Sequence, residues 1–152
     1  MNSDQIKMEI ISISKSKKKG TKKTIVETAQ LVKNHGLEGD AHAGDWHRQV
    51  SFLSSESIDQ SRKAGLDVTF GDFAENISTI GIDWKTIPIG TRFKLGETAI
   101  VEITQIGKEC VQKCAIYYQA GDCIMPREGV FAKVLEGGVI HTGDKIEYIC
   151  SS

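Results

Sequence analysis

The chain has 152 residues, of which 39% are hydrophobic and 26% are charged, and its net charge is −1. This length suits one domain with a substantial core, and the near-neutral charge argues against a dedicated nucleic-acid binder, which normally carries a basic excess. No apolar run approaches the roughly 18 residues of a membrane span, and the N-terminus lacks a signal-peptide pattern. We therefore predict a single domain, residues 1–152, in the cytoplasm, where thiols stay reduced.

The first half of the chain is punctuated by glycines that separate short apolar runs, a pattern typical of β-rich folds. Ser54 or Ser55 is suited to cap a helix, because its side-chain oxygen can accept from first-turn amides, and Gly65 is suited to end it. The predicted elements are a strand at Lys7–Ile13, an exposed loop or strand tip at Lys15–Lys23, a strand or short helix at Thr24–Val32, a strand at Gln49–Leu53 and a helix at Ser54–Ala64.

The second half gives the clearest sheet pattern, with a hairpin predicted where Gly96 and Glu97 separate two alternating runs. The predicted strands are Phe73–Ile80, Thr91–Leu95, Thr98–Ile106, Val130–Leu135 and Lys145–Ile149, with a turn at Gly143–Asp144. Strands at roughly ten-residue spacing without alternating helices favour a closed or half-closed β-barrel over a parallel α/β sheet. We predict a mainly β fold of barrel type with a few short peripheral helices.

A run of lysines occupies the predicted loop Lys15–Lys23. Like charges repel and rarely pack, so we expect a solvated, mobile loop. The functional alternative is a flexible collar that attracts an anionic ligand or an acidic partner.

The segment Gly36–Leu53 holds two histidines, two aspartates and Arg48. His42 and His47 do not have the i, i+4 spacing of two ligands on one helical face, and the glycines argue against a helix. A metal bound from a loop and a turn in which these side chains bond the local backbone both remain open. Arg48 directly before an apolar strand suits a phosphate or carboxylate, with an ordinary ion pair as the alternative.

Cys110, Cys114 and Cys123 lie close together in the sequence. If Val111–Tyr118 is a short helix, Cys110 lies at its start, where the helix dipole favours thiolate, so it is the best candidate for a reactive or metal-ligating sulfur. Cys114 is either its redox partner or a buried apolar residue, and Cys123 can approach the same site. Cys150 is interpreted as incidental, and Arg127 is an anion-binding candidate by local sequence.

Several ordered motifs give the chain a resemblance to a known family. They are the GxxGDxHxG turn from Gly36, Arg48-Gln49-Val50, Glu75-Asn76, Ile89-Gly90, Cys110 and the closing Gly143-Asp144. Over residues 36–146 the chain resembles the MOSC domain, which is named for the C-terminal part of molybdenum cofactor sulfurases. The resemblance implies a β-barrel with a few peripheral helices, as in small stand-alone members.

The resemblance also implies a function, namely handling of molybdenum cofactor (molybdopterin) or of its sulfur. Cys110 matches the hallmark cysteine, which would ligate molybdenum or carry a persulfide, with Cys114 and Cys123 as possible helpers. Arg48, Asn76, Arg127 and His47 are the cofactor-binding candidates.

We expect a carrier module that serves cofactor-biosynthesis proteins or an acceptor molybdoenzyme. The alternatives are a molybdenum-dependent reductase of N-hydroxylated substrates and a structural thiolate–zinc protein, so whether the chain is an enzyme stays open. The aminotransferase-like domain of full-length sulfurases is not present in this sequence, so pyridoxal phosphate is not expected in this chain alone.

Overall fold

The fold is described from a computed structural model, which describes residues 8–18, 22–65, 67–73, 75–107 and 129–151. The described part is mainly β, as predicted, and its strands form two sheets. The larger sheet has eight strands in the order β11-β7-β8-β9-β5-β6-β1-β2. Their bounds are β1 (Glu9–Lys15), β2 (Thr24–Val26), β5 (Val50–Ser54), β6 (Ile77–Ile80), β7 (Thr91–Leu95), β8 (Ala99–Ile106), β9 (Val130–Glu136) and β11 (Ile146–Ser151).

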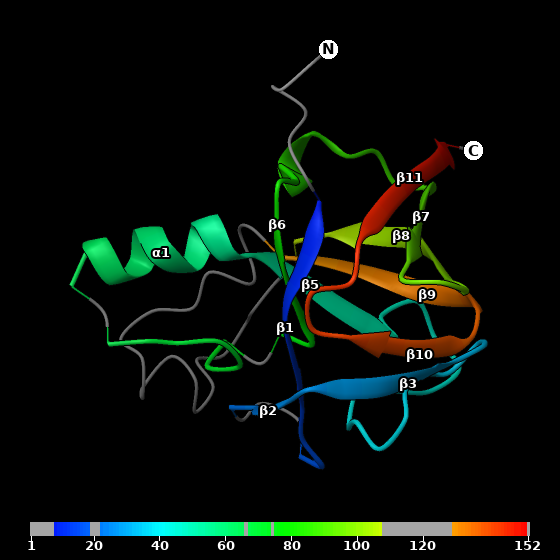
Figure 1. Cartoon of the computed structure of the whole chain (residues 1–152), viewed down its shortest axis with the longest axis horizontal. Helices are drawn as coiled ribbons and strands as arrows, with labels where there is room; N and C mark the ends of the chain where they lie inside the picture. The colour runs from blue at the N-terminus through cyan, green and yellow to red at the C-terminus, as the bar shows by residue number, and fades with distance from the viewer. Residues whose placement is uncertain (1–7, 19–21, 66, 74, 108–128, 152) are drawn as a thin grey trace.

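The smaller sheet has three strands in the order β10-β3-β4. These are β3 (Thr28–Val32), β4 (Gly36–Leu37) and β10 (Gly138–His141). In Figure 1, β3 and β10 run side by side below β8 and β9 of the larger sheet, and α1 (Ser55–Lys63) stands to one side. A single 3-10 turn, η1 (Trp84–Thr86), completes the regular elements among the described residues.

The predicted barrel closure is not confirmed, because no closed barrel forms among the described residues. The edge strand β11 nevertheless approaches β1, which is the last strand but one on the opposite side of the large sheet. Ile10 N donates to Asp144 O at 2.9 Å, Ile146 N donates to Met8 O at 2.8 Å, and an isolated bridge joins Glu9 to Lys145. The turn before β11 therefore lies against the start of β1.

Helix α1 begins and ends where capping chemistry predicts. Ser54 is the N-cap and its Oγ accepts from Ser57 N at 3.1 Å, while the chain leaves the helix at Gly65 with φ +101°. The helix joins β5 to β6, which pair in parallel. The sheet is therefore mixed, and this one parallel pair departs from the expectation of a sheet without helical crossovers.

The hairpin prediction is confirmed, since β7 and β8 pair antiparallel with Leu95 opposite Ala99. The segment Thr24–Val32 is β rather than helical, but it is divided between β2 and β3 at Glu27. The prediction of one strand over Phe73–Ile80 is wrong in its first half, because β6 begins only at Ile77. The short strands β4 and β10 carry too little periodicity to be predicted.

The core lies between the two sheets and is built by both. The Trp84 ring packs between Phe52 in a tilted contact and Phe93 in an edge-to-face contact, with ring centroids 5.2 Å and 5.4 Å apart. Leu31 and Ile140 of the smaller sheet are fully buried in the same hydrophobic cluster. Burial of this apolar surface is the main force that holds the smaller sheet onto the larger one.

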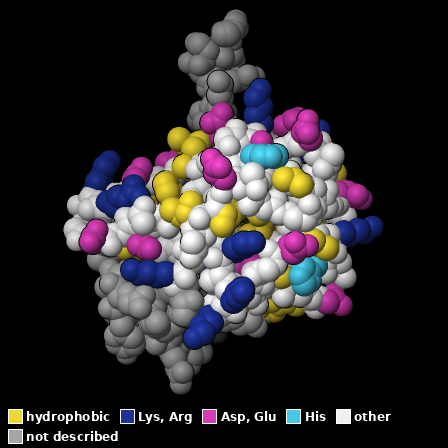
Figure 2. Space-filling model, turned by 60° about the horizontal axis from the view of Figure 1, so that its bottom comes forward, with side chains coloured by type: hydrophobic (Ala, Val, Ile, Leu, Met, Phe, Trp, Pro, Cys, Tyr) yellow, Lys and Arg dark blue, Asp and Glu magenta, His cyan; other side chains and the backbone are white. Residues whose placement is uncertain are grey.

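Figure 2 shows the charge on one face of the molecule. Basic and acidic side chains are interspersed there rather than gathered by sign, in keeping with the net charge of −1. Electrostatic attraction of a ligand to the described part of this face would therefore act locally, through single side chains.

Candidate functional site

The loop of residues 38–49 carries the polar candidates and joins β4 to β5 without regular secondary structure. We call it the Arg48 loop. Gln49 anchors its end: this side chain is fully buried, its Oε1 accepts from Val134 N at 2.8 Å, and its Nε2 donates to Asn34 Oδ1 at 3.2 Å. Arg48 is thus fixed to the start of a central strand, which is a rigid base for a binding residue.

Arg48 has an unusual environment. Its guanidinium carbon lies 4.6 Å from the centroid of the Trp46 ring and 5.6 Å from that of Phe131. Its Nε is buried and has no hydrogen-bond partner among the described residues, and the structure shows no ion pair for its charge within the described ranges. A buried donor without a partner is costly, and a guanidinium fork matches phosphate or carboxylate oxygens. The ion-pair alternative for Arg48 is therefore not supported by the described residues.

His47 lies beside Arg48 at the end of strand β8. Its Nε2 is 2.8 Å from Gln105 Oε1, and its carbonyl accepts a hydrogen bond from Thr104 Oγ1. Gln105 Nε2 donates in turn to Gly107 O at 2.7 Å. His47 and Arg48 therefore both lie close to the ends of β8 and β9.

Gly107 follows β8 and Gly129 precedes β9, and Gly107 N donates to Gly129 O at 2.6 Å. Phe131, the ring under Arg48, pairs with Gln105 across the same two strands. Gly107 and Gly129 are thus adjacent to each other, and the ring that contacts Arg48 lies two residues after Gly129.

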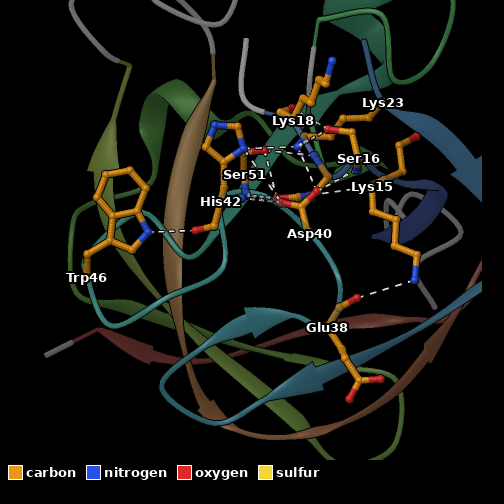
Figure 3. A network of polar contacts seen from close by, with 11 residues as sticks. Lys15, Ser16, Lys18, Lys23, Glu38, Asp40, His42, Trp46 and Ser51 are labelled. Atoms are coloured by element: carbon orange, nitrogen blue, oxygen red, sulfur yellow. Dashed lines mark hydrogen bonds and ion pairs between the residues drawn. The ribbon is translucent and has the colours of Figure 1, made fainter. Parts of the chain in front are cut away.

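A second polar cluster, missed by the sequence interpretation, lies within the same loop (Figure 3). Lys23 Nζ is 2.8 Å from Asp40 Oδ1, and both side chains are completely buried. Asp40 also accepts from the backbone amides of Ser16 and His42, each at 3.0 Å. The expectation that the whole lysine run is solvated is wrong for Lys23, because a buried carboxylate from the Arg48 loop pairs with it.

The electrostatics of Asp40 reflect this cluster. Burial alone would raise the pKa of Asp40, but the Lys23 ammonium and the two backbone amides outweigh it and hold that pKa below its usual value. Lys23 Nζ is also 3.1 Å from His42 Nδ1. Since an ammonium has only donors, Nδ1 accepts in this contact and the ring proton of a neutral His42 is on Nε2.

Asn76 and Glu75 of the family motif have contacts within the fold. Asn76 is fully buried; its Oδ1 accepts from Ser51 N at 3.0 Å and its Nδ2 donates to Ser14 O at 3.2 Å. Glu75 accepts from Gly71 N at 2.7 Å and Phe73 N at 3.2 Å. Both motif side chains are therefore engaged by the backbone of the fold itself.

The predicted sulfur residues Cys110, Cys114 and Cys123 lie outside the described residues, as do Arg127 and the helix predicted at Val111–Tyr118. Cys150 belongs to β11. Within the described ranges, no three His, Cys, Asp or Glu side chains come together as a metal site requires, so a loop metal site on His42 and His47 is not supported. None of the described helices has the length and apolar character to cross a membrane.

A comparison with family models matches the MOSC domain over residues 38–147. The chain belongs to the MOSC domain family. This match covers the motifs on which the resemblance in the sequence rests, except for the first two residues of the turn that begins at Gly36. The MOSC domain is associated in general with molybdenum cofactor binding and with sulfur-related functions. A comparison with curated protein sequences finds no match.

Solved structures share the MOSC fold of this chain. YiiM from Geobacillus stearothermophilus is 22% identical with a TM-score of 0.73, over 94% of this chain and 75% of that one. The YuaD protein from Bacillus subtilis is 20% identical with a TM-score of 0.73, over 94% of both chains. YiiM from Escherichia coli is 21% identical with a TM-score of 0.66, over 97% of this chain and 70% of that one. At these identities the likeness concerns the fold alone.

Proposed function

We propose that this MOSC domain is a binding and carrier module for molybdenum cofactor or its sulfur, in which Arg48 binds the anionic end of the ligand and Cys110 supplies a thiolate. The observation that carries the proposal is the guanidinium of Arg48. It combines aromatic contacts with a buried Nε that has no partner among the described residues. A phosphate oxygen in the guanidinium plane would satisfy that donor.

Chain connectivity supports a common site for Arg48 and Cys110. Cys110 follows Gly107 by three residues, so covalent geometry limits the distance between their Cα atoms to about 11 Å. Gly107 itself lies at the end of β8, where Gln105 bonds both to it and to His47. A ligand anchored on Arg48 would therefore be within reach of a sulfur on Cys110.

The donor set fits the cofactor in part. The bound cofactor would supply a redox-active metal held through sulfur and a phosphate for recognition. Arg48 suits the phosphate as a fork of N–H donors, and His47 can offer a further polar contact at the same edge. Thiolate is a soft donor that suits molybdenum or sulfane sulfur. Ligand contacts of Asn76 and Arg127 remain proposals of the same kind, as do a cytoplasmic location and partners in cofactor biosynthesis or an acceptor molybdoenzyme.

The test is co-expression in a host that makes molybdenum cofactor, followed by metal analysis and by fluorescence of the pterin released from the purified protein. Arg48→Gln and Cys110→Ser should each lower the pterin and molybdenum retained per chain by at least about tenfold. Arg92→Gln and Cys150→Ser are the matched controls, because Arg92 has an ion-pair partner in Glu102, and they should retain the wild-type amounts. If Arg48→Gln retained the wild-type amount of pterin and molybdenum, Arg48 would not be the anion-binding residue. If Cys110→Ser retained it, Cys110 would not supply the thiolate.

The same samples separate the alternatives. Stoichiometric zinc that is lost when two of Cys110, Cys114 and Cys123 are replaced would indicate a structural thiolate–zinc site instead. Reduction of N-hydroxylated amidines by the molybdenum-loaded protein, given an electron donor, would indicate the reductase. Retained pterin without turnover would support the carrier.

A further inference from the structure

The ion pair of Lys23 and Asp40 is buried, and a buried ion pair by itself adds little net stability to a small domain. Removing two charges from water costs several kcal/mol per ion, and their attraction often does no more than offset that cost. Both side chains are fully buried, and among the described residues the only regular element next to either in sequence is the short strand β2 after Lys23. The geometry of the pair therefore suggests a role in fixing the loop around it.

Asp40 holds the loop through its backbone. Its two carboxylate oxygens accept from the amides of Ser16 and His42, so one side chain joins the turn after β1 to the Arg48 loop. A further backbone bond, from Ala41 N to Ser16 O at 2.7 Å, runs parallel to these. Lys23 is itself fixed, because its backbone N donates to Gly71 O at 2.8 Å.

From His42 the chain of contacts continues to the site. The carbonyl of His42 accepts a hydrogen bond from the indole Nε1 of Trp46 at 2.8 Å (Figure 3). The Trp46 ring in turn lies against the guanidinium of Arg48. The Arg48 loop has no regular secondary structure, so nothing in a helix or sheet ladder sets the orientation of this indole. The hydrogen bond to the His42 carbonyl is therefore one of the contacts that orient the indole, together with the edge contact between the Trp46 and His47 rings.

We propose that Lys23 and Asp40 are positioning residues for Arg48: the buried pair fixes the His42 peptide, this peptide orients Trp46, and Trp46 aims the guanidinium at the anion of the ligand. The inference rests on the proposed function for its ligand, but the path from Asp40 to Trp46 is independent of it. A group held in this way loses little freedom on binding, which is how residues that touch no ligand tune affinity.

The experiment uses two signals that the chain provides. It has two tryptophans, so a 15N-labelled sample gives two indole N–H resonances. Trp46 reports on the network, while Trp84, whose Nε1 donates to Thr79 Oγ1 at 2.9 Å inside the core, is the internal reference. Inorganic phosphate is titrated as the probe, and the Arg48 Nε–H resonance is followed together with the indoles.

In the wild type, phosphate should shift the Trp46 and Arg48 resonances and leave Trp84 in place. Asp40→Asn should move the Trp46 resonance before any phosphate is added and weaken phosphate binding by about tenfold. Asp59→Asn is the matched control, because it removes a carboxylate that is also 2.8 Å from its basic partner but is exposed on α1. This control should leave both resonances and the affinity unchanged.

Because Asp40→Asn can fail to fold, Trp46→Phe provides a second variant that leaves the buried pair intact. It keeps an aromatic ring next to Arg48 but removes the indole N–H that bonds His42, and it should weaken phosphate binding several-fold. Wild-type affinity in Trp46→Phe, or an unmoved Trp46 resonance in folded Asp40→Asn, overturns the inference. Absence of phosphate binding by the wild type would instead contradict the proposed anion site, and the Trp46 and Arg48 resonances of Asp40→Asn would then decide the positioning role alone.

Discussion

Replacement of Asp40 by asparagine should reveal how much a fully buried ion pair matters to this domain. The chain offers a close control in Asp59, since each carboxylate lies 2.8 Å from a basic nitrogen, Lys23 Nζ in one case and Arg62 Nη1 in the other. The two pairs differ in exposure. The side chains of Lys23 and Asp40 are 0% exposed, whereas those of Arg62 and Asp59 are 38% and 56% exposed.

The expected magnitudes follow from this difference. At 2.8 Å and an effective dielectric constant of about 20, two unit charges attract by about 6 kcal/mol, and much of this offsets the desolvation of the pair. Removal of one partner leaves Lys23 charged and buried, which costs about 3–5 kcal/mol in comparable cases. Asparagine keeps one carbonyl oxygen for the Ser16 or His42 amide, so we expect Asp40→Asn to cost about 3–4 kcal/mol. For Asp59→Asn we expect less than about 1 kcal/mol.

Urea denaturation at pH 7 measures both values through the midpoint and the slope m. The pH is well above the lowered pKa of Asp40, so the wild-type carboxylate is ionised throughout. Asp40→Asn should lower the urea midpoint strongly at unchanged m. Added salt should affect the wild-type ion pair little, because salt screens a buried pair far less than an exposed one. Free energies of unfolding of the two variants that agree within about 1 kcal/mol would show that burial does not govern this interaction.

Three further perturbations test other parts of the structure. Burial raises the pKa of Glu75 from 4.5 to about 6 against the opposing hydrogen bonds, so the native state holds this proton more tightly than the unfolded one. The free energy of unfolding should therefore fall by about 1.6 kcal/mol between pH 4.5 and pH 7, and urea titrations should show that Glu75→Gln removes this slope. Arg48→Met should abolish cofactor retention yet change the free energy of unfolding, measured with urea, by less than about 1 kcal/mol, because it removes a buried donor without a partner among the described residues. Gly71→Ala should lower the free energy of unfolding by at least about 2 kcal/mol in thermal or urea unfolding, since φ is +87° and a Cβ would lie 2.4 Å from Lys23 O. The control Gly65→Ala, at φ +101° with nothing within 4 Å of a Cβ, should lower it by only about 1 kcal/mol.

The elements that the sequence predicts well are those specified locally. The β7–β8 hairpin follows from alternation around Gly96, and α1 follows from the Ser54 cap and Gly65. The parallel pairing of β5 with β6 could not be predicted, because it depends on how α1 packs back onto the sheet. Strand β10 is likewise non-local, since its four residues pair with β3, far earlier in the chain.

The candidate site shows the same division. Arg48 was identified from its motif and its place before an apolar strand, both of which are local. Lys23 was assigned to a solvated run because composition alone shows only its basic neighbours, while its partner Asp40 lies in a separate segment. The one available signal was the Gly39–Asp40 step of the motif, which indicates an aspartate with a fixed structural task but not the identity of its partner.

The motif residues also differ in whether their side chains are hydrogen-bonded to the backbone of the protein. Asp40 and Asn76 direct their side-chain oxygens to backbone amides within the protein, and Gln49 bonds β9 in the same way. If one of these oxygens bound a ligand instead, the protein would give up a buried hydrogen bond, which costs about 1–3 kcal/mol. Arg48 has no such bond to give up among the described residues, so ligand binding there gains an interaction without losing one. On this argument Arg48, rather than Asn76, should dominate the anion affinity, and Arg48→Gln should lower it far more than Asn76→Asp does at equal folded fraction.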